Sequence, residues 1–138
     1  MLWEQLEIEK GILCLTGSGG KTTLAHELAR QLPGTVLFCT TTRIWPAESS
    51  LPVLVCPTEA ELSAALRKYR AVCAGVPAER GKLSALEIPM VRLRHLADYV
   101  VVEADGSKTL PLKAHLSYEP VIPPETDQTI LVVGASGL

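Results

Sequence analysis

Short apolar runs alternate with longer amphipathic segments along the whole chain. Six of the runs have the length and composition of buried strands: residues 11–16, 35–40, 53–56, 71–74, 98–103 and 129–133. Because they are continuously apolar rather than alternating, they are typical of strands that are covered on both faces. The pattern therefore predicts a mostly parallel sheet.

Three of the intervening segments have the period of helices. Leucines recur at every fourth position of residues 21–32, and a capping box formed by Thr58 and Glu61 predicts a second helix that runs to about residue 70. A third helix is expected over residues 89–97, with proline in its first turn. Residues 77–86 have no clean period and are expected to form a loop. Alternating strands and helices predict a three-layer α/β sandwich, with ligands beyond the carboxyl ends of its strands.

Composition narrows the class of protein. The 138 residues are enough for the core of one domain, which we expect to span residues 1–138. The net charge of -2 argues against a dedicated nucleic-acid-binding protein. No apolar run approaches the roughly 18 residues that span a bilayer, and the first residues lack a basic leader. We therefore expect a cytoplasmic protein with neither a nucleic acid nor a membrane as its partner.

The four cysteines are scattered, with no pair at the spacing of a zinc or redox motif. Each lies in or beside an apolar run, where a free cysteine behaves as a small buried hydrophobic residue. We expect these residues to be structural; the alternative is a metal or redox site, which requires the fold to bring several of them together.

A glycine-rich loop connects the first strand to the first helix. Its candidate phosphate-binding residues are Gly17, Ser18, Gly19, Gly20, Lys21, Thr22 and Thr23. Backbone amides at such a turn bind phosphate oxygens, the lysine reaches the terminal phosphates, and the first threonine hydroxyl binds Mg²⁺. The match is to a short G-x-x-G-K-T form, and the alternative is a glycine turn with a solvated lysine. A dinucleotide fingerprint is rejected, since it requires glycine where Thr22 stands.

Polar residues follow two other predicted strands. Glu103 and Asp105 end the most apolar strand, where acids bind Mg²⁺ or orient an attacking water in phosphate-loop folds; the alternative is a pair of surface carboxylates. Being two residues apart in an extended chain, both side chains are expected to point the same way. Thr41 and its neighbouring threonines end the second strand, where their hydroxyls could bind Mg²⁺ or phosphate and Arg43 could neutralise charge; the alternative is that threonine is simply a common strand residue. Lys108, in a long proline-rich segment, is a candidate phosphate contact or, equally, a solvated lysine.

These motifs resemble those of the YqeC family of selenium-dependent hydroxylase accessory proteins. The similarity rests on residues 15–23, 40–42, 102–108, 111–114 and 119–123. It implies a fold like that of P-loop NTPases and a role in maturing molybdenum hydroxylases with a nucleoside triphosphate, ATP or GTP. A molybdenum hydroxylase or its cofactor-maturation proteins are the implied partners. Family members usually continue well past the final Val-Val-Gly stretch, so we expect a domain that is cut short at its C-terminal end.

Two hypotheses about function remain open. In the first, the chain is a Mg²⁺-dependent nucleoside triphosphatase or phosphotransferase in which Lys21, Glu103 and Asp105 are catalytic and Thr22, Glu103 and Asp105 bind the metal. In the second, it is a non-catalytic adapter gated by nucleotide, with residues 111–124 as a docking surface. No Asn-Lys-x-Asp string for guanine is present, so the sequence leaves the base open.

Overall fold

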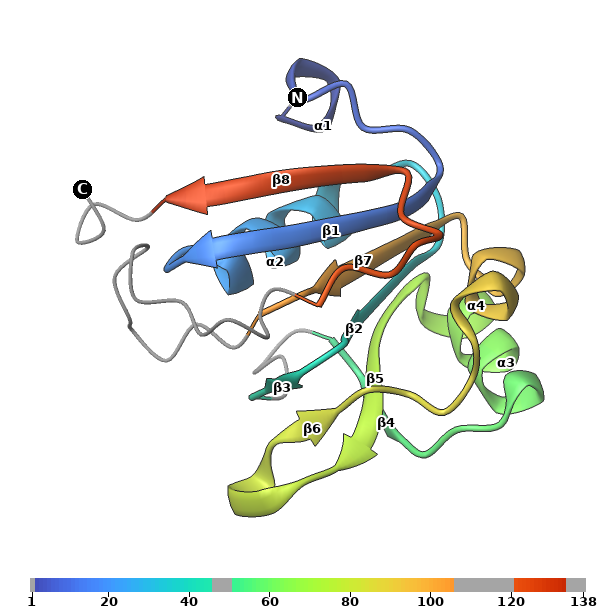
Figure 1. The fold of residues 1–138 in the computed structure, drawn as a ribbon. Helices are drawn as coiled ribbons and strands as arrows, with labels where there is room; N and C mark the ends of the chain where they lie inside the picture. Colours follow the sequence, from blue (N-terminus) through green and yellow to red (C-terminus); the bar gives the residue numbers. More distant parts are fainter. Residues whose placement is uncertain (1, 46–50, 106–120, 134–138) are drawn as a thin grey trace.

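The computed structural model describes residues 2–45, 51–105 and 121–133 of the chain. They form a twisted sheet with the strand order β3-β6-β5-β2-β7-β1-β8, and β4 pairs with β5 beside this path (Figure 1). The strands are β1 (Gly11–Ser18), β2 (Val36–Thr40), β3 (Arg43–Ile44), β4 (Val53–Val55), β5 (Ala71–Pro77), β6 (Leu83–Ser84), β7 (Tyr99–Glu103) and β8 (Gln128–Val133). All six predicted strands are confirmed, with ends that shift by at most three residues.

The pairing is parallel except around β6, which runs antiparallel to both β3 and β5. The prediction of a loop over residues 77–86 is wrong, since the chain there forms the short helix η1 (Glu79–Gly81) and then β6. The physical reason is burial: the Leu83 side chain is 3% exposed, and the Ser84 hydroxyl donates a hydrogen bond to the Val76 carbonyl oxygen at 3.1 Å. A single apolar residue in a two-residue strand leaves too short a pattern to detect.

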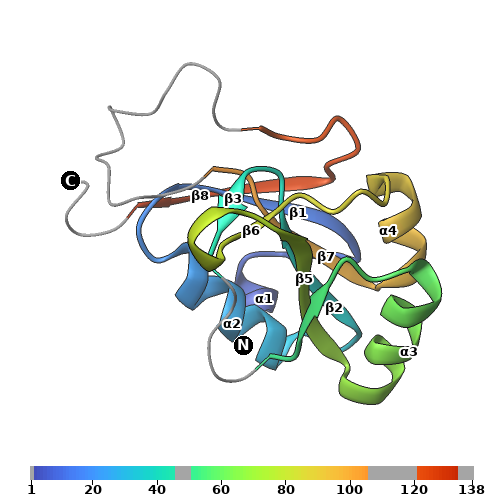
Figure 2. The same ribbon diagram turned by 90° about the horizontal axis from the view of Figure 1, so that it is seen from below.

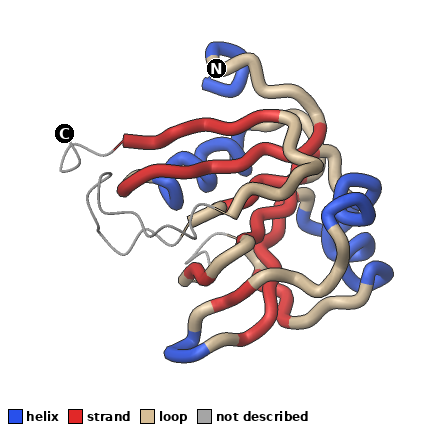
Figure 3. Tube along the Cα trace, in the orientation of Figure 1, coloured by secondary structure: helices blue, strands red, loops and turns tan. Residues whose placement is uncertain are grey.

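Helices cover both faces of the sheet. They are α1 (Leu2–Gln5), α2 (Lys21–Gln31), α3 (Glu59–Tyr69) and α4 (Met90–Leu96). Successive residues of each central strand enter different cores: Leu13 of β1 lies in the core with Leu28 of α2, and Ile12 lies in the core with Leu62 of α3 and Leu93 of α4. Figures 2 and 3 show the sheet between these helices. The predicted mixed α/β architecture with a layered sheet is confirmed.

Local signals set the ends of α2 and α3. The predicted capping box is present, with the Thr58 amide donating to Glu61 Oε1 at 2.9 Å and the Glu61 amide donating to Thr58 Oγ1 at 3.1 Å. Arg70 follows α3, and its guanidinium donates to the carbonyl oxygens of Ala29 and Leu32 at 2.5 and 2.8 Å. Arg70 thereby satisfies carbonyls at the C-terminal end of α2 that would otherwise lack intrahelical partners.

The cysteines follow the prediction in part. Cys14, Cys39 and Cys73 are buried on strands of the sheet, and burial raises the pKa of Cys39 far above its usual range. Cys56 differs from the expectation because it is exposed, just past the edge strand β4. Burial raises the pKa of Cys14 as well, and a buried thiol with a raised pKa is a poor nucleophile, so Cys14 and Cys39 fit a structural role. Within the three described ranges, no helix is both long and apolar enough to cross a membrane.

Candidate functional site

The register of the two central strands brings the glycine loop and the acidic residues to one edge of the sheet. β1 and β7 are parallel neighbours, with Leu15 opposite Glu103. The residues that follow these two positions therefore lie together beyond the carboxyl ends of the strands. Figure 1 shows β1 leading into α2 at this edge.

Glycines shape the loop. Gly17, Gly19 and Gly20 have φ angles of 112°, 72° and 78°, in the region that side chains disfavour. At Gly17 a Cβ atom would also lie 2.0 Å from the Val132 carbonyl oxygen, so β8 can approach β1 only because this residue is glycine. Gly20 is the N-cap of α2 and supplies no side-chain hydrogen bond to the helix amides. The N-terminus of α2 thus keeps the partial positive charge that attracts anions.

Lys21 is the first residue of α2 and lies inside the protein. Its side chain is 1% exposed, and its ammonium group donates to the Asp105 carbonyl oxygen at 2.8 Å and to Asp105 Oδ1. Glu103 Oε1 lies 3.8 Å from the same nitrogen. The other carboxylate oxygen of Asp105 accepts a hydrogen bond from the Gly17 amide at 3.2 Å. The structure therefore brings Lys21, Glu103 and Asp105 into one buried cluster that touches the glycine loop.

Burial dominates the electrostatics of this cluster. It raises the pKa of Glu103 to about 7, a shift that the Lys21 charge opposes and the Asp105 charge reinforces. A carboxyl group whose pKa is close to neutral can both accept and release a proton under cellular conditions. Glu103 is therefore suited to proton transfer, while Asp105 holds the lysine and the loop.

The hydroxyl groups of two threonines at the end of β2 donate to backbone carbonyl oxygens, and that of Thr40 donates to the backbone of Glu103 in this cluster. The Thr40 hydroxyl is buried, donates to the Glu103 carbonyl oxygen at 2.8 Å and accepts from the Thr42 amide at 2.9 Å. The Thr41 hydroxyl donates to the Val121 carbonyl oxygen at 2.6 Å. Thr40 fixes the end of β7, a role that sequence reasoning missed because it depends on β2 and β7 being neighbours.

The other described residues that the sequence predicts for the phosphate site lie outside the buried cluster. Thr22 and Thr23 are exposed in the first turn of α2, directly after Lys21. Arg43 forms an ion pair with Glu79 of η1, with its Nε atom 3.0 Å from the carboxylate. Ser18 ends β1. Lys108 falls outside the described residues.

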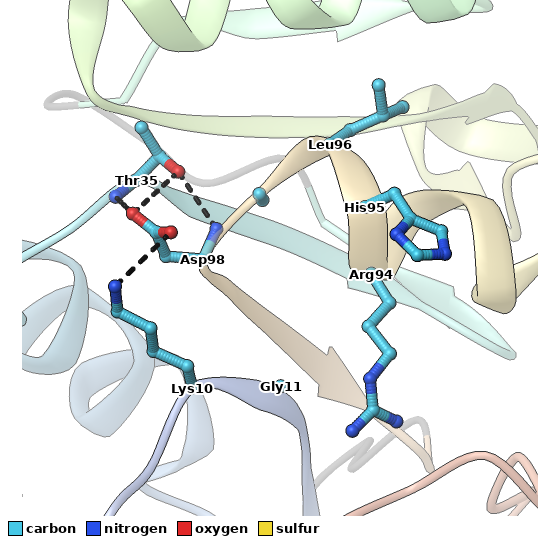
Figure 4. A pocket seen from close by; sticks show the side chains of 8 residues that line it. Lys10, Gly11, Thr35, Arg94, His95, Leu96 and Asp98 are labelled. Atoms are coloured by element: carbon cyan, nitrogen blue, oxygen red, sulfur yellow. Dashed lines mark hydrogen bonds and ion pairs between the residues drawn. The ribbon is translucent and has the colours of Figure 1, made fainter.

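The opposite edge of the sheet has a hollow of about 240 Å³ at the amino ends of β1, β2 and β7. Figure 4 shows Asp98 there between Thr35 and Lys10, with the Arg94 side chain extending away from them. The Asp98 carboxylate accepts from the Thr35 amide at 3.0 Å and lies 3.7 Å from the Lys10 ammonium group. Because Asp98 joins the starts of three strands, its contacts are explained by the fold.

Comparison with known proteins gives the family. The sequence model of the YqeC protein family matches residues 13–138. The chain belongs to the YqeC family. The Uncharacterized protein YqeC of Escherichia coli (strain K12) is 34% identical over 135 residues, which cover 92% of this chain and 53% of that relative. The chain thus spans about half the length of this curated member of the YqeC family. No solved structure matches the chain.

Proposed function

We propose that this YqeC-family chain binds a Mg²⁺–nucleoside triphosphate at the carboxyl edge of its sheet, as P-loop NTPases do, and hydrolyses the nucleotide or transfers its terminal phosphoryl group. One observation carries the proposal: Lys21, at the start of α2, contacts two buried carboxyl groups at the end of β7, the strand beside β1. A lysine at the start of a helix, a glycine loop and an acid on the next strand together form the recurrent arrangement for binding phosphate and metal.

Each residue of the proposed site has a role that follows from its chemistry. The amides of the glycine loop and the N-terminus of α2 bind phosphate oxygens, and the Lys21 ammonium group moves onto the terminal phosphate. Mg²⁺ takes oxygen ligands and uses few protein groups, so the Thr22 hydroxyl and the Asp105 or Glu103 carboxylate fit it. When bound, Mg²⁺ neutralises charge on the phosphate oxygens. Glu103 accepts the proton of the attacking water or acceptor hydroxyl.

The biological setting is a further part of the proposal. From the resemblance of its motifs to those of selenium-dependent hydroxylase accessory proteins, we propose that the chain acts as an accessory protein in the maturation of selenium-dependent molybdenum hydroxylases. The hydroxylase or its cofactor-maturation proteins are the partners that this role requires. A non-catalytic adapter would use the same site for binding without turnover.

Calorimetric titration with ATP and GTP in Mg²⁺ tests the site. Lys21→Met is expected to weaken binding roughly tenfold or more, because a charge-assisted contact to phosphate is lost. Lys10→Met is the matched control. Lys10 directly precedes β1 at the amino edge of the sheet, where it pairs with Asp98. Thr22→Val is a second variant at an exposed position, so its expected loss of Mg²⁺-supported binding is independent of folding.

Phosphate release separates the two hypotheses. Turnover that disappears in Lys21→Met supports catalysis, and binding without turnover supports the adapter. If neither nucleotide binds to the folded wild-type protein, or if both the Lys21 and Thr22 variants bind like wild type, the proposed site is wrong. Circular dichroism of each variant shows whether a loss of binding reflects a loss of fold.

A further inference from the structure

The Asp105 carboxylate lies where the glycine loop would hold an anionic ligand. One of its oxygens accepts the Gly17 amide at 3.2 Å, and the other accepts the Lys21 ammonium group. A loop amide and the lysine are the groups that a phosphate would need. We propose that Asp105 is an internal competitor for phosphate, so that this site selects polyphosphates complexed with a divalent cation and rejects the metal-free anions. This inference rests on the proposed function.

The charges of the cluster favour such selection. Among the described residues, one ammonium group faces two carboxyl groups in this cluster, and the side chains of Lys21, Glu103 and Asp105 are between 1% and 7% exposed. A metal-free polyphosphate would bring several more negative charges to a place that water screens poorly. It would also take the lysine from Asp105, and the loss of an opposite charge at a buried carboxylate is costly.

A divalent cation changes this balance. Carboxylate oxygens are ligands that Mg²⁺ prefers, so a cation arriving with the polyphosphate gives Asp105 a new partner as Lys21 leaves it. The exchange then conserves the number of opposite-charge contacts. Asp105 would thus set the specificity of the site, because the same carboxylate excludes the bare anion and accepts its metal complex.

A second carboxylate that accepts a backbone amide of β1 provides a comparison. Asp127 Oδ2 accepts the Ile12 amide of β1 at 2.8 Å, and its Oδ1 accepts from Arg94 at 2.8 Å. Its side chain is 35% exposed, so water can solvate it if a partner leaves. Asp127 therefore has the same kinds of contact as Asp105 without the burial that would make their exchange selective.

The experiment titrates the full chain with inorganic triphosphate by calorimetry, once in EDTA and once in excess Mg²⁺. Wild type is expected to bind the Mg²⁺ complex at least about tenfold more tightly than the metal-free anion. Asp105→Asn keeps the side-chain shape and an oxygen for the Gly17 amide but removes the charge. It is expected to bind the metal-free anion roughly tenfold more tightly than wild type and the Mg²⁺ complex more weakly. Asp127→Asn, the matched control, is expected to bind both like wild type.

Asp105→Asn is expected to change the two affinities in opposite directions. A merely structural role of Asp105 would instead weaken the binding of both the metal-free anion and the Mg²⁺ complex. If Asp105→Asn binds the metal-free anion no better than wild type does, while wild type binds the Mg²⁺ complex, the inference is overturned and the proposed function stands. If triphosphate binds to neither protein under either condition, both fail.

A measurement on wild type alone covers the case in which Asp105→Asn does not fold. The NMR resonance of the Gly17 amide should shift when the Mg²⁺ complex is added and stay in place with triphosphate in EDTA. Equal shifts in both titrations would contradict selection by Asp105.

Discussion

Each edge of the sheet holds a carboxylate that accepts a backbone amide of β1 and pairs with a cation, yet the surroundings are opposite. At the amino edge, Asp127 and Arg94 have side chains that are 35% and 41% exposed. At the carboxyl edge, Lys21 and Asp105 are each 1% exposed. The Arg94–Asp127 pair is therefore solvated, whereas the Lys21–Asp105 pair is buried together with Glu103.

The difference indicates that stability alone does not account for the charged residues at the carboxyl edge. Exposed ion pairs contribute about 0–1 kcal/mol, and a buried pair contributes little net stability because desolvation offsets the attraction. Apolar side chains of similar volume would fill the carboxyl edge at least as well. Buried charges beside a glycine loop are the arrangement that the proposed phosphate site requires.

The largest contrast is expected from removing one cation at each edge. Lys21→Met leaves two buried carboxyl groups without their counter-charge, and should lower the free energy of unfolding by about 4 kcal/mol at pH 8. Lys10→Met removes an exposed partner of Asp98 and should change it by less than about 0.5 kcal/mol. Urea unfolding of both variants measures the difference. Equal changes would mean that the carboxyl edge is as solvated as the amino edge.

The two edges should also respond to pH with opposite signs. Burial raises the pKa of Glu103 from 4.5 to about 7, so the folded protein binds this proton more tightly than the unfolded chain does. Its contribution to stability is fully present below pH 4.5 and is lost as the pH rises through 7, by up to about 3 kcal/mol. The Ile12 amide and then Arg94 lower the pKa of Asp127, so its contribution is present above its unfolded pKa and is lost as the pH falls.

Glu103→Gln isolates the first effect. Between pH 4.5 and 7 the free energy of unfolding of wild type should fall relative to that of the variant, because glutamine does not titrate. Urea unfolding of both proteins at pH 5, 6, 7 and 8 gives the difference directly. A difference that stays constant with pH would show that the pKa of Glu103 is not raised in solution.

The sequence reveals the parts of the carboxyl edge that depend on local chemistry. The glycines before Lys21 and the acids after an apolar strand are visible as short motifs, and parallel strands are expected to present their carboxyl ends at one edge. The two-residue spacing of Glu103 and Asp105 also predicts that they share a direction, and both contact Lys21.

Other contacts depend on pairings between distant segments. Thr40 can support Glu103 only because β7 lies beside β2, and this strand order is set by packing of the whole sheet. Arg70 looks like an ordinary basic residue at a helix end, yet it binds carbonyls of α2 about 40 residues away. The Lys21–Asp105 contact is of the same kind, since it joins residues separated by 84 positions. The sequence predicts that both residues lie beyond the carboxyl ends of strands, but it does not predict that one neutralises the other.

The smallest predicted effect tests whether exposure is what separates the edges. Arg94→Met should lower the free energy of unfolding by less than about 1 kcal/mol in low salt, and this difference should shrink in 1 M NaCl, where the Debye length is about 3 Å. The cost of Lys21→Met should persist in the same salt, because ions screen buried charges much less. Urea unfolding in low salt and in 1 M NaCl measures the loss of unfolding free energy for both Arg94→Met and Lys21→Met. If salt removes the cost of Lys21→Met as well, water and ions reach the carboxyl edge in solution, and Asp105 would have no desolvation barrier with which to reject a metal-free polyphosphate.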